Sequence, residues 1–171
     1  MNTAPLLAEG AAILIKDYVK ANIVNALTVI RTNRADAQVV LQEPLNYFLY
    51  EPAKGYKTPA MFFIVDDFDF KITENMANHI NGTIKMRLAC VVEDRDMSQL
   101  TYKTWRYQSA LHSLLAQTHL TTTDNKLKIT VVVKRASFSP AFSPAANKGS
   151  IEAVFRKEVM LELDVVHREN Y

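Results

Sequence analysis

The sequence predicts an α+β fold, a mixed and mainly antiparallel sheet covered by two helices, with a long C-terminal β-hairpin. Apolar residues recur at helical spacing near the N-terminus, and later segments alternate apolar and polar residues with the period of a strand. A capped helix separates those strand segments. The 171 residues match the size of one compact domain, so we predict a single domain over residues 1–171.

Residues 5–32 are predicted to form the first helix. Their apolar positions recur at steps of three and four and make one face, which a second apolar row widens. Alanines within this face allow close packing on a sheet, so a core helix is favoured over an intersubunit role. The face comprises Ala8, Ala12, Ile15, Val19, Ile23, Ala26 and Ile30, and the second row comprises Leu7, Ala11, Leu14 and Tyr18.

Residues 33–59 are predicted to be loops with one or two short strands, because their three prolines cannot donate hydrogen bonds to a ladder. The apolar run 60–65 predicts a strand that is buried on both faces. Residues 68–73 alternate apolar and polar side chains, which predicts a strand with one face in water.

Asn81-Gly82 is a common turn dipeptide and predicts a turn. Strict alternation then resumes over residues 84–92, and we expect this strand to pair antiparallel with the preceding one. Asp96 is predicted to cap the second helix, with Gln99 as its partner in a capping box.

The second helix is predicted to end near residue 118. Alternation over residues 127–133 and 151–166 then predicts the C-terminal hairpin. Sixteen extended residues would reach about 50 Å, so part of the last strand is expected to bend or protrude. Residues 138–149 contain a near-repeat of Phe-Ser-Pro and are predicted to be a flexible tip, or an arm that a neighbour orders.

The composition narrows the function classes. Hydrophobic residues make up 49% of the chain and charged residues 22%, as in an ordinary globular protein. The net charge is only +2 and no long basic run occurs, which argues against a dedicated nucleic-acid binder. We expect no membrane span and no signal peptide, since no apolar run of about 18 residues and no basic leader is present. The single cysteine, Cys90, cannot form an internal disulfide.

Asp66, Asp67 and Asp69 are the clearest candidates for chemistry, because clustered carboxylates can bind Mg²⁺ or share protons. Alternation predicts Asp67 and Asp69 on one strand face and Asp66 on the other. No His or Glu at a suitable spacing completes a site, so an acidic strand edge is favoured over a metal site. Four glycines cannot build a phosphate-binding loop. We therefore predict no catalytic, metal or cofactor site.

The hairpin carries two further features. Phe138 and Phe142 form an exposed aromatic pair that can anchor a second protein, and folding back over their own core is the alternative. If the two strands of the hairpin pair in the expected register, Lys134 and Arg135 are predicted to come near Arg156 and Lys157. Such a modest basic patch could meet a phosphate. Cross-strand pairs with Glu152 or Glu158 are the alternative for these cations.

One pattern runs through a strand, its neighbour and the second helix: residues 59–67, residues 84–92, and Tyr107, Leu111, Leu114 and Leu115. In composition and order these stretches resemble the tail terminator and tail-completion proteins of long-tailed bacteriophages. The resemblance covers roughly residues 8–167. It implies an α/β sandwich with a helix-covered sheet, a single tail-terminator-like domain, and no catalysis.

The resemblance also implies a place and partners. Six copies would form a homo-hexameric ring in the virion, assembled in the host cytoplasm, between the tail tube protein and the head connector or neck proteins. The tail sheath is a further candidate partner, and neither a membrane nor sequence-specific nucleic acid is expected. Loops and the hairpin would dock on these partners, and strand edges with one helix would make the ring contacts. The expected interface residues are Phe138, Phe142, Lys134, Arg135, Arg156, Asp67 and Asp69.

Two alternatives remain open. The long N-terminal helix and the extended hairpin depart from small members of that family, which favours a neck or head-completion adaptor as the nearest rival. A small metal-dependent hydrolase using the three aspartates is the rival of a different class.

Overall fold

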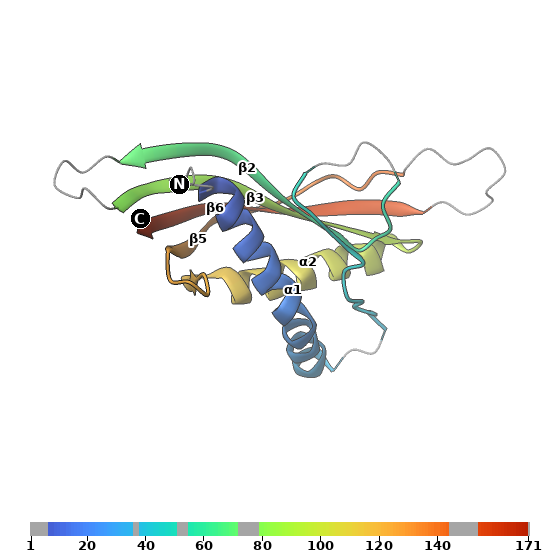
Figure 1. Cartoon of the computed structure of the whole chain (residues 1–171). Helices are drawn as coiled ribbons and strands as arrows, with labels where there is room; N and C mark the ends of the chain where they lie inside the picture. Colours follow the sequence, from blue (N-terminus) through green and yellow to red (C-terminus); the bar gives the residue numbers. More distant parts are fainter. Residues whose placement is uncertain (1–6, 36–37, 51–54, 72–78, 144–153, 171) are drawn as a thin grey trace.

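The computed structural model describes residues 7–35, 38–50, 55–71, 79–143 and 154–170. Within them the sheet has six strands in the order β1-β2-β3-β6-β5-β4, parallel between β1 and β2 and antiparallel at every other junction (Figure 1). This confirms the predicted α+β fold. The elements are α1 (Leu7–Arg34), β1 (Asn46–Phe48), β2 (Ala60–Lys71), β3 (His79–Asp94), α2 (Met97–Leu115), β4 (Thr118–Thr121), β5 (Leu127–Phe138) and β6 (Phe155–Asn170).

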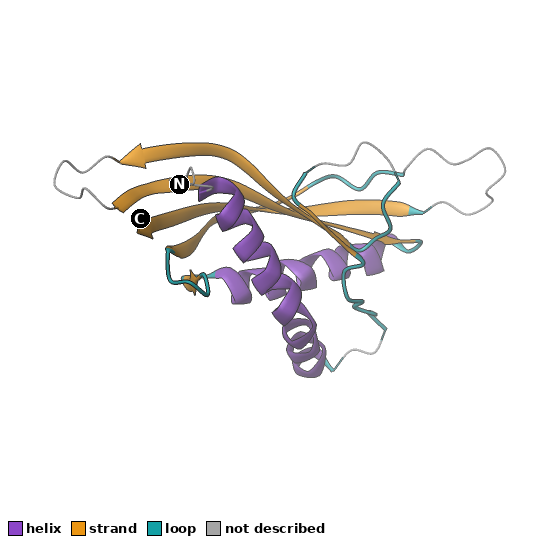
Figure 2. Cartoon of the chain, viewed as in Figure 1, coloured by secondary structure: helices purple, strands orange, loops and turns teal. Residues whose placement is uncertain are grey.

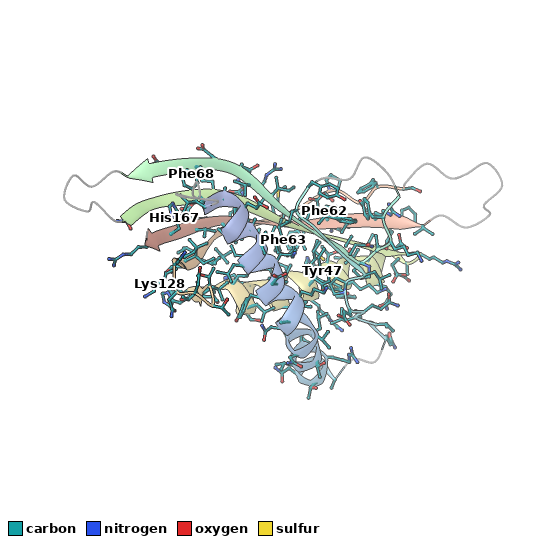
Figure 3. All side chains as sticks on the ribbon, in the orientation of Figure 1. Tyr47, Phe62, Phe63, Phe68, Lys128 and His167 are labelled. Atoms are coloured by element: carbon teal, nitrogen blue, oxygen red, sulfur yellow. The ribbon has the colours of Figure 1, made fainter. Side chains whose placement is uncertain are left out.

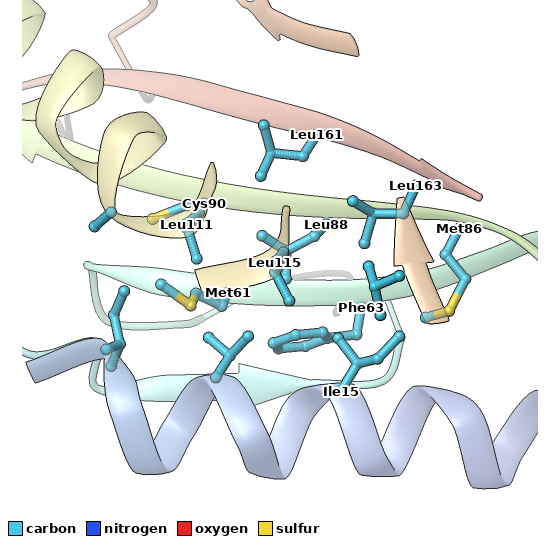
Figure 4. Close-up of a cluster of buried hydrophobic side chains, with 14 of the residues drawn as sticks. Ile15, Met61, Phe63, Met86, Leu88, Cys90, Leu111, Leu115, Leu161 and Leu163 are labelled. Atoms are coloured by element: carbon cyan, nitrogen blue, oxygen red, sulfur yellow. The ribbon is translucent and has the colours of Figure 1, made fainter. Parts of the chain in front are cut away.

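Both helices lie on the same face of the sheet, and one hydrophobic core fills the space between the layers (Figure 2). Alternate residues of each central strand point into it, because successive side chains of a strand face opposite sides. Ile15 of α1, Phe63 of β2 and Leu115 of α2 meet there (Figure 4), each at most 1% exposed. Burying each such side chain contributes about 1.5–3 kcal/mol, so this layer fixes the position of the sheet.

The predicted cap of α2 is confirmed. The Asp96 carboxylate accepts hydrogen bonds from the backbone N–H groups of Ser98 and Gln99 at 2.7 and 3.0 Å. The reciprocal capping-box bond is wrong, because the Asp96 N–H donates to Oδ1 of Asp94 at 2.9 Å. Asp94 also binds Nζ of Lys103 at 2.5 Å and so ties the end of β3 to the first turns of α2.

The turn predicted at Asn81-Gly82 is also wrong, since both residues lie inside β3. Gly82 pairs with Phe70 on one side and His167 on the other. A Cβ atom on residue 82 would lie 2.3 Å from the backbone oxygen of Asp69 and 2.6 Å from Nε2 of His167. The glycine is therefore required by close packing between strands.

The other strand predictions hold in part. β2 is buried on both faces over Ala60–Phe63, whereas Val65 is exposed. The antiparallel pairing of β2 with β3 and of β5 with β6 is confirmed. β4, at residues 118–121, was not predicted, because four residues with two threonines next to a helix end give a weak signal.

Candidate functional site

The face of the sheet away from the helices carries charges in two cross-strand rows. The first row runs from Asp67 on β2 through Lys85 and Asp164 to Lys134 on β5. Nζ of Lys85 lies 3.6 Å from Oδ2 of Asp67, and Nζ of Lys134 lies 3.6 Å from Oδ2 of Asp164. Charge therefore alternates across four strands, beginning with an acid on β2 and ending with a base on β5.

The second row lies beside the first and has the same order of charges. Nε of Arg87 donates to both carboxylate oxygens of Asp66 at 2.8 Å, and its Nη2 lies 2.7 Å from Oδ1. Arg87 pairs in register with Glu162, which pairs with Arg135. Both rows therefore start in carboxylates at the β2 edge and end in cations toward the β5 edge.

Two β-bulges produce this arrangement. The register shifts between Val65 and Asp67 in β2 and between Val133 and Arg135 in β5. A bulge inserts one extra residue and interrupts alternation. The expectation that Asp66 faces away from Asp67 is therefore wrong, because both carboxylates contact cations of β3 that share a face.

Two stretches of strand are uncovered on their outer side within the described ranges. β1 pairs with β2 only over Ala60–Phe62, so no described strand lies beside residues 63–71 of β2. β4 pairs with β5 only over Lys128–Val131, so residues 132–138 of β5 are likewise open. We call them the acidic edge (63–71, with Asp66, Asp67, Asp69 and Lys71) and the basic edge (132–138, with Lys134 and Arg135).

The hairpin continues beyond β5 as an arm. Backbone N–H and C=O groups of Phe142 and Arg156 are joined by two hydrogen bonds of 2.9 and 2.7 Å. Phe138 and Phe142 are 41% and 44% exposed, as expected for an anchor. Residues 144–149 of the predicted flexible tip lie outside the described residues.

Arg156 does not join Lys134 and Arg135, so the predicted basic patch is wrong. The register places Arg156 opposite Phe142 and Arg135 opposite Glu162, well apart along β6. Nε of Arg156 instead donates to Oε2 of Glu93 on β3 at 3.1 Å, and its guanidinium lies 5.3 Å from the centre of the Tyr56 ring. The sequence does not mark Glu93 as the partner of Arg156, because the two residues are 63 positions apart and meet only through the pairing of β3 with β6.

A groove that the sequence patterns did not predict lies between α2 and the C-terminal half of α1. It has a volume of about 640 Å³, and Tyr102 and Trp105 line it with their rings 5.8 Å apart. These aromatics are about half exposed, and α2 contains no Asp or Glu. An aromatic pair three residues apart and off the buried stripe of α2 is a signal that could have found this groove.

Groups with altered proton affinity lie inside the fold. Burial raises the pKa of the Cys90 thiol, which keeps it protonated and unreactive. His167 is 2% exposed and stacks on Phe68 with ring centres 5.0 Å apart (Figure 3). Burial lowers the pKa of His167.

Over the described ranges, no three His, Cys, Asp or Glu side chains are grouped to hold a metal. No helix in these ranges is long and apolar enough to cross a membrane.

No protein-family model and no curated protein matches the chain. A solved structure described as "Virion of native gene transfer agent (GTA) particle" contains a chain that overlays on it with a TM-score of 0.48 and 10% sequence identity. The overlay covers 95% of this chain and 99% of that chain.

Proposed function

We propose that the chain is a structural protein of a phage-like virion, a tail terminator whose six copies form a ring between the tail tube and the head connector. The observation that carries this proposal is the pair of open edges on opposite sides of one sheet. Monomeric proteins commonly cover or blunt such edges, because the unpaired backbone N–H and C=O groups of an edge strand can pair with a strand of another chain. A closed ring of identical contacts would cover both edges in every copy.

The exposed residues fall into two groups, one proposed to make contacts within the ring and the other to bind partner proteins. Asp67 and Asp69 on one edge and Lys134 and Arg135 on the other are proposed ring contacts. Phe138 and Phe142 on the arm are proposed to anchor the ring on the tail tube or the connector, since exposed aromatic side chains commonly dominate binding energy. Arg156 is proposed to hold the arm in place through Glu93 and Tyr56.

The proposed role involves no catalysis. The Asp66 and Asp67 carboxylates already bind Arg87 and Lys85, so a divalent cation would have to compete with two positive charges for the same oxygens. The proposed location is the virion tail or neck, after assembly in the host cytoplasm. The tail tube protein and the connector or neck proteins are the proposed partners, with the tail sheath as a third.

Deleting the gene from a particle-producing genome that encodes it tests this function. Without a terminator, tubes are expected to vary in length and heads to stay unjoined, and a plasmid copy restores normal particles. Electron micrographs of lysates would report both features. Tails of normal length that fail to join heads would instead identify a neck adaptor, and normal joined particles would contradict both roles.

A further inference from the structure

We propose that the acidic edge of one copy pairs with the basic edge of the next, so that the sheets of neighbouring subunits run on into each other. This inference rests on the proposed ring and names the contact that closes it. The partner is a second copy of this chain.

The two edges are open at the same level of the sheet. Following the register from β2 through β3 and β6 to β5, Phe63 aligns with Ala136 and Asp67 aligns with Val132. Residues 64–67 and 132–135, which are exposed or partly exposed, therefore stand at the same level and can meet a neighbour placed directly alongside. Both bulges lie within this shared level. A bulge can blunt an edge, but here both edges carry one, and the two bulges lie one register step apart.

The strand directions also fit. Three antiparallel junctions separate β2 from β5, so the two strands run in opposite directions within one copy. A rotation about an axis parallel to the strands keeps these directions whatever its angle. The neighbour's β5 would then lie antiparallel to β2, the ladder with the better hydrogen bonds. Because two different edges meet, the contact repeats from copy to copy and closes into a ring when the rotation allows.

Charge selects this pairing over the alternatives. An acidic edge against its own kind would bring the aspartates of two copies together, and two basic edges would oppose their Lys134 and Arg135 side chains. The charge rows of the sheet begin in Asp66 and Asp67 and end in Lys134 and Arg135. Placed in line, the rows of two copies therefore continue the same alternation across the junction.

Disulfide trapping tests the pairing. In a Cys90→Ala background, Asp67→Cys and Val132→Cys, which stand at the same register level, are combined in one chain and oxidised at high protein concentration. Within a copy these positions are three strand spacings apart, about 14 Å, whereas a disulfide needs Cα atoms closer than about 7 Å. Any disulfide must therefore join two copies. We expect a non-reducing gel to show a ladder from dimer to hexamer.

The controls separate this contact from the ring itself. Either single cysteine variant should give at most dimers, and Asp67→Cys with Lys128→Cys should give no ladder, because β4 covers residue 128. Wild-type rings without a ladder from the paired cysteines would refute this contact and leave the proposed function standing. Failure of the wild type to form rings, even with tail tubes present, would overturn the function as well.

Discussion

Gly82 of β3 pairs in register with His167 of β6, and the lack of a side chain at Gly82 leaves room for the His167 ring. The space beside Gly82 is what lets the His167 ring lie flat on Phe68. An Asn-Gly pair in a sequence favours a turn, and only the pairing with two neighbouring strands shows why glycine is needed within β3. A feature that depends on residues 85 positions away leaves no local pattern in the sequence.

His167 should make the protein less stable in acid. The pKa of His167 is lowered in the folded state. As the pH falls below about 6.5, the unfolded chain therefore takes up a proton on this side chain before the folded chain does. The free energy of unfolding is therefore highest above that pH and falls as the pH drops, by about 1.4 kcal/mol for each pKa unit of lowering. Urea unfolding between pH 5 and 8 measures this slope.

The matched variants are His167→Leu and His112→Gln, since the His112 side chain is exposed. Removing His167 should reduce the acid-dependent slope, whatever it does to overall stability, whereas the His112 variant should keep the wild-type slope. An unchanged slope in the His167 variant would show that other groups cause the acid sensitivity.

At the scale of elements, the two helices and the antiparallel pairing of β2 with β3 and of β5 with β6 were predicted correctly. The turn at Asn81-Gly82 and the side-chain contacts between neighbouring strands were not. The first helix and the α2 cap depend on residues three or four apart, and the sequence contains both patterns. The bulges at Asp66 and Lys134, and the Arg156–Glu93 pair, depend on which strands become neighbours. The acidic strand edge could therefore be predicted, but its cationic partners and its counterpart on β5 could not.

The cap of α2 offers a direct check of such a local signal. Asp96→Ala removes the acceptor of two backbone N–H groups and should lower the free energy of unfolding by about 1 kcal/mol. Chemical denaturation with a Ser98→Ala control measures the loss, because the exposed Ser98 contributes only its backbone N–H to the cap. Equal stability of the two variants would mean that the cap contributes little.

For the whole molecule, both the charge distribution and the sheet topology favour a ring of identical contacts. A net charge of only +2 hides an uneven distribution, with carboxylates on one open edge and cations on the other. Neither edge alone favours self-association, because each repels its own kind. Together they make a subunit whose two sides fit in only one order, and this is the property that a ring requires.

Native mass spectrometry of the purified protein, with and without tail tubes, tests this claim most directly. We expect six-copy particles that dissociate as salt screens the contact. Lys134→Glu should give single copies and Asp67→Lys with Lys134→Glu should restore six, since the charges again oppose at every junction. Single copies of the wild type under all conditions, or intact six-copy particles of the Lys134→Glu variant, would contradict the account.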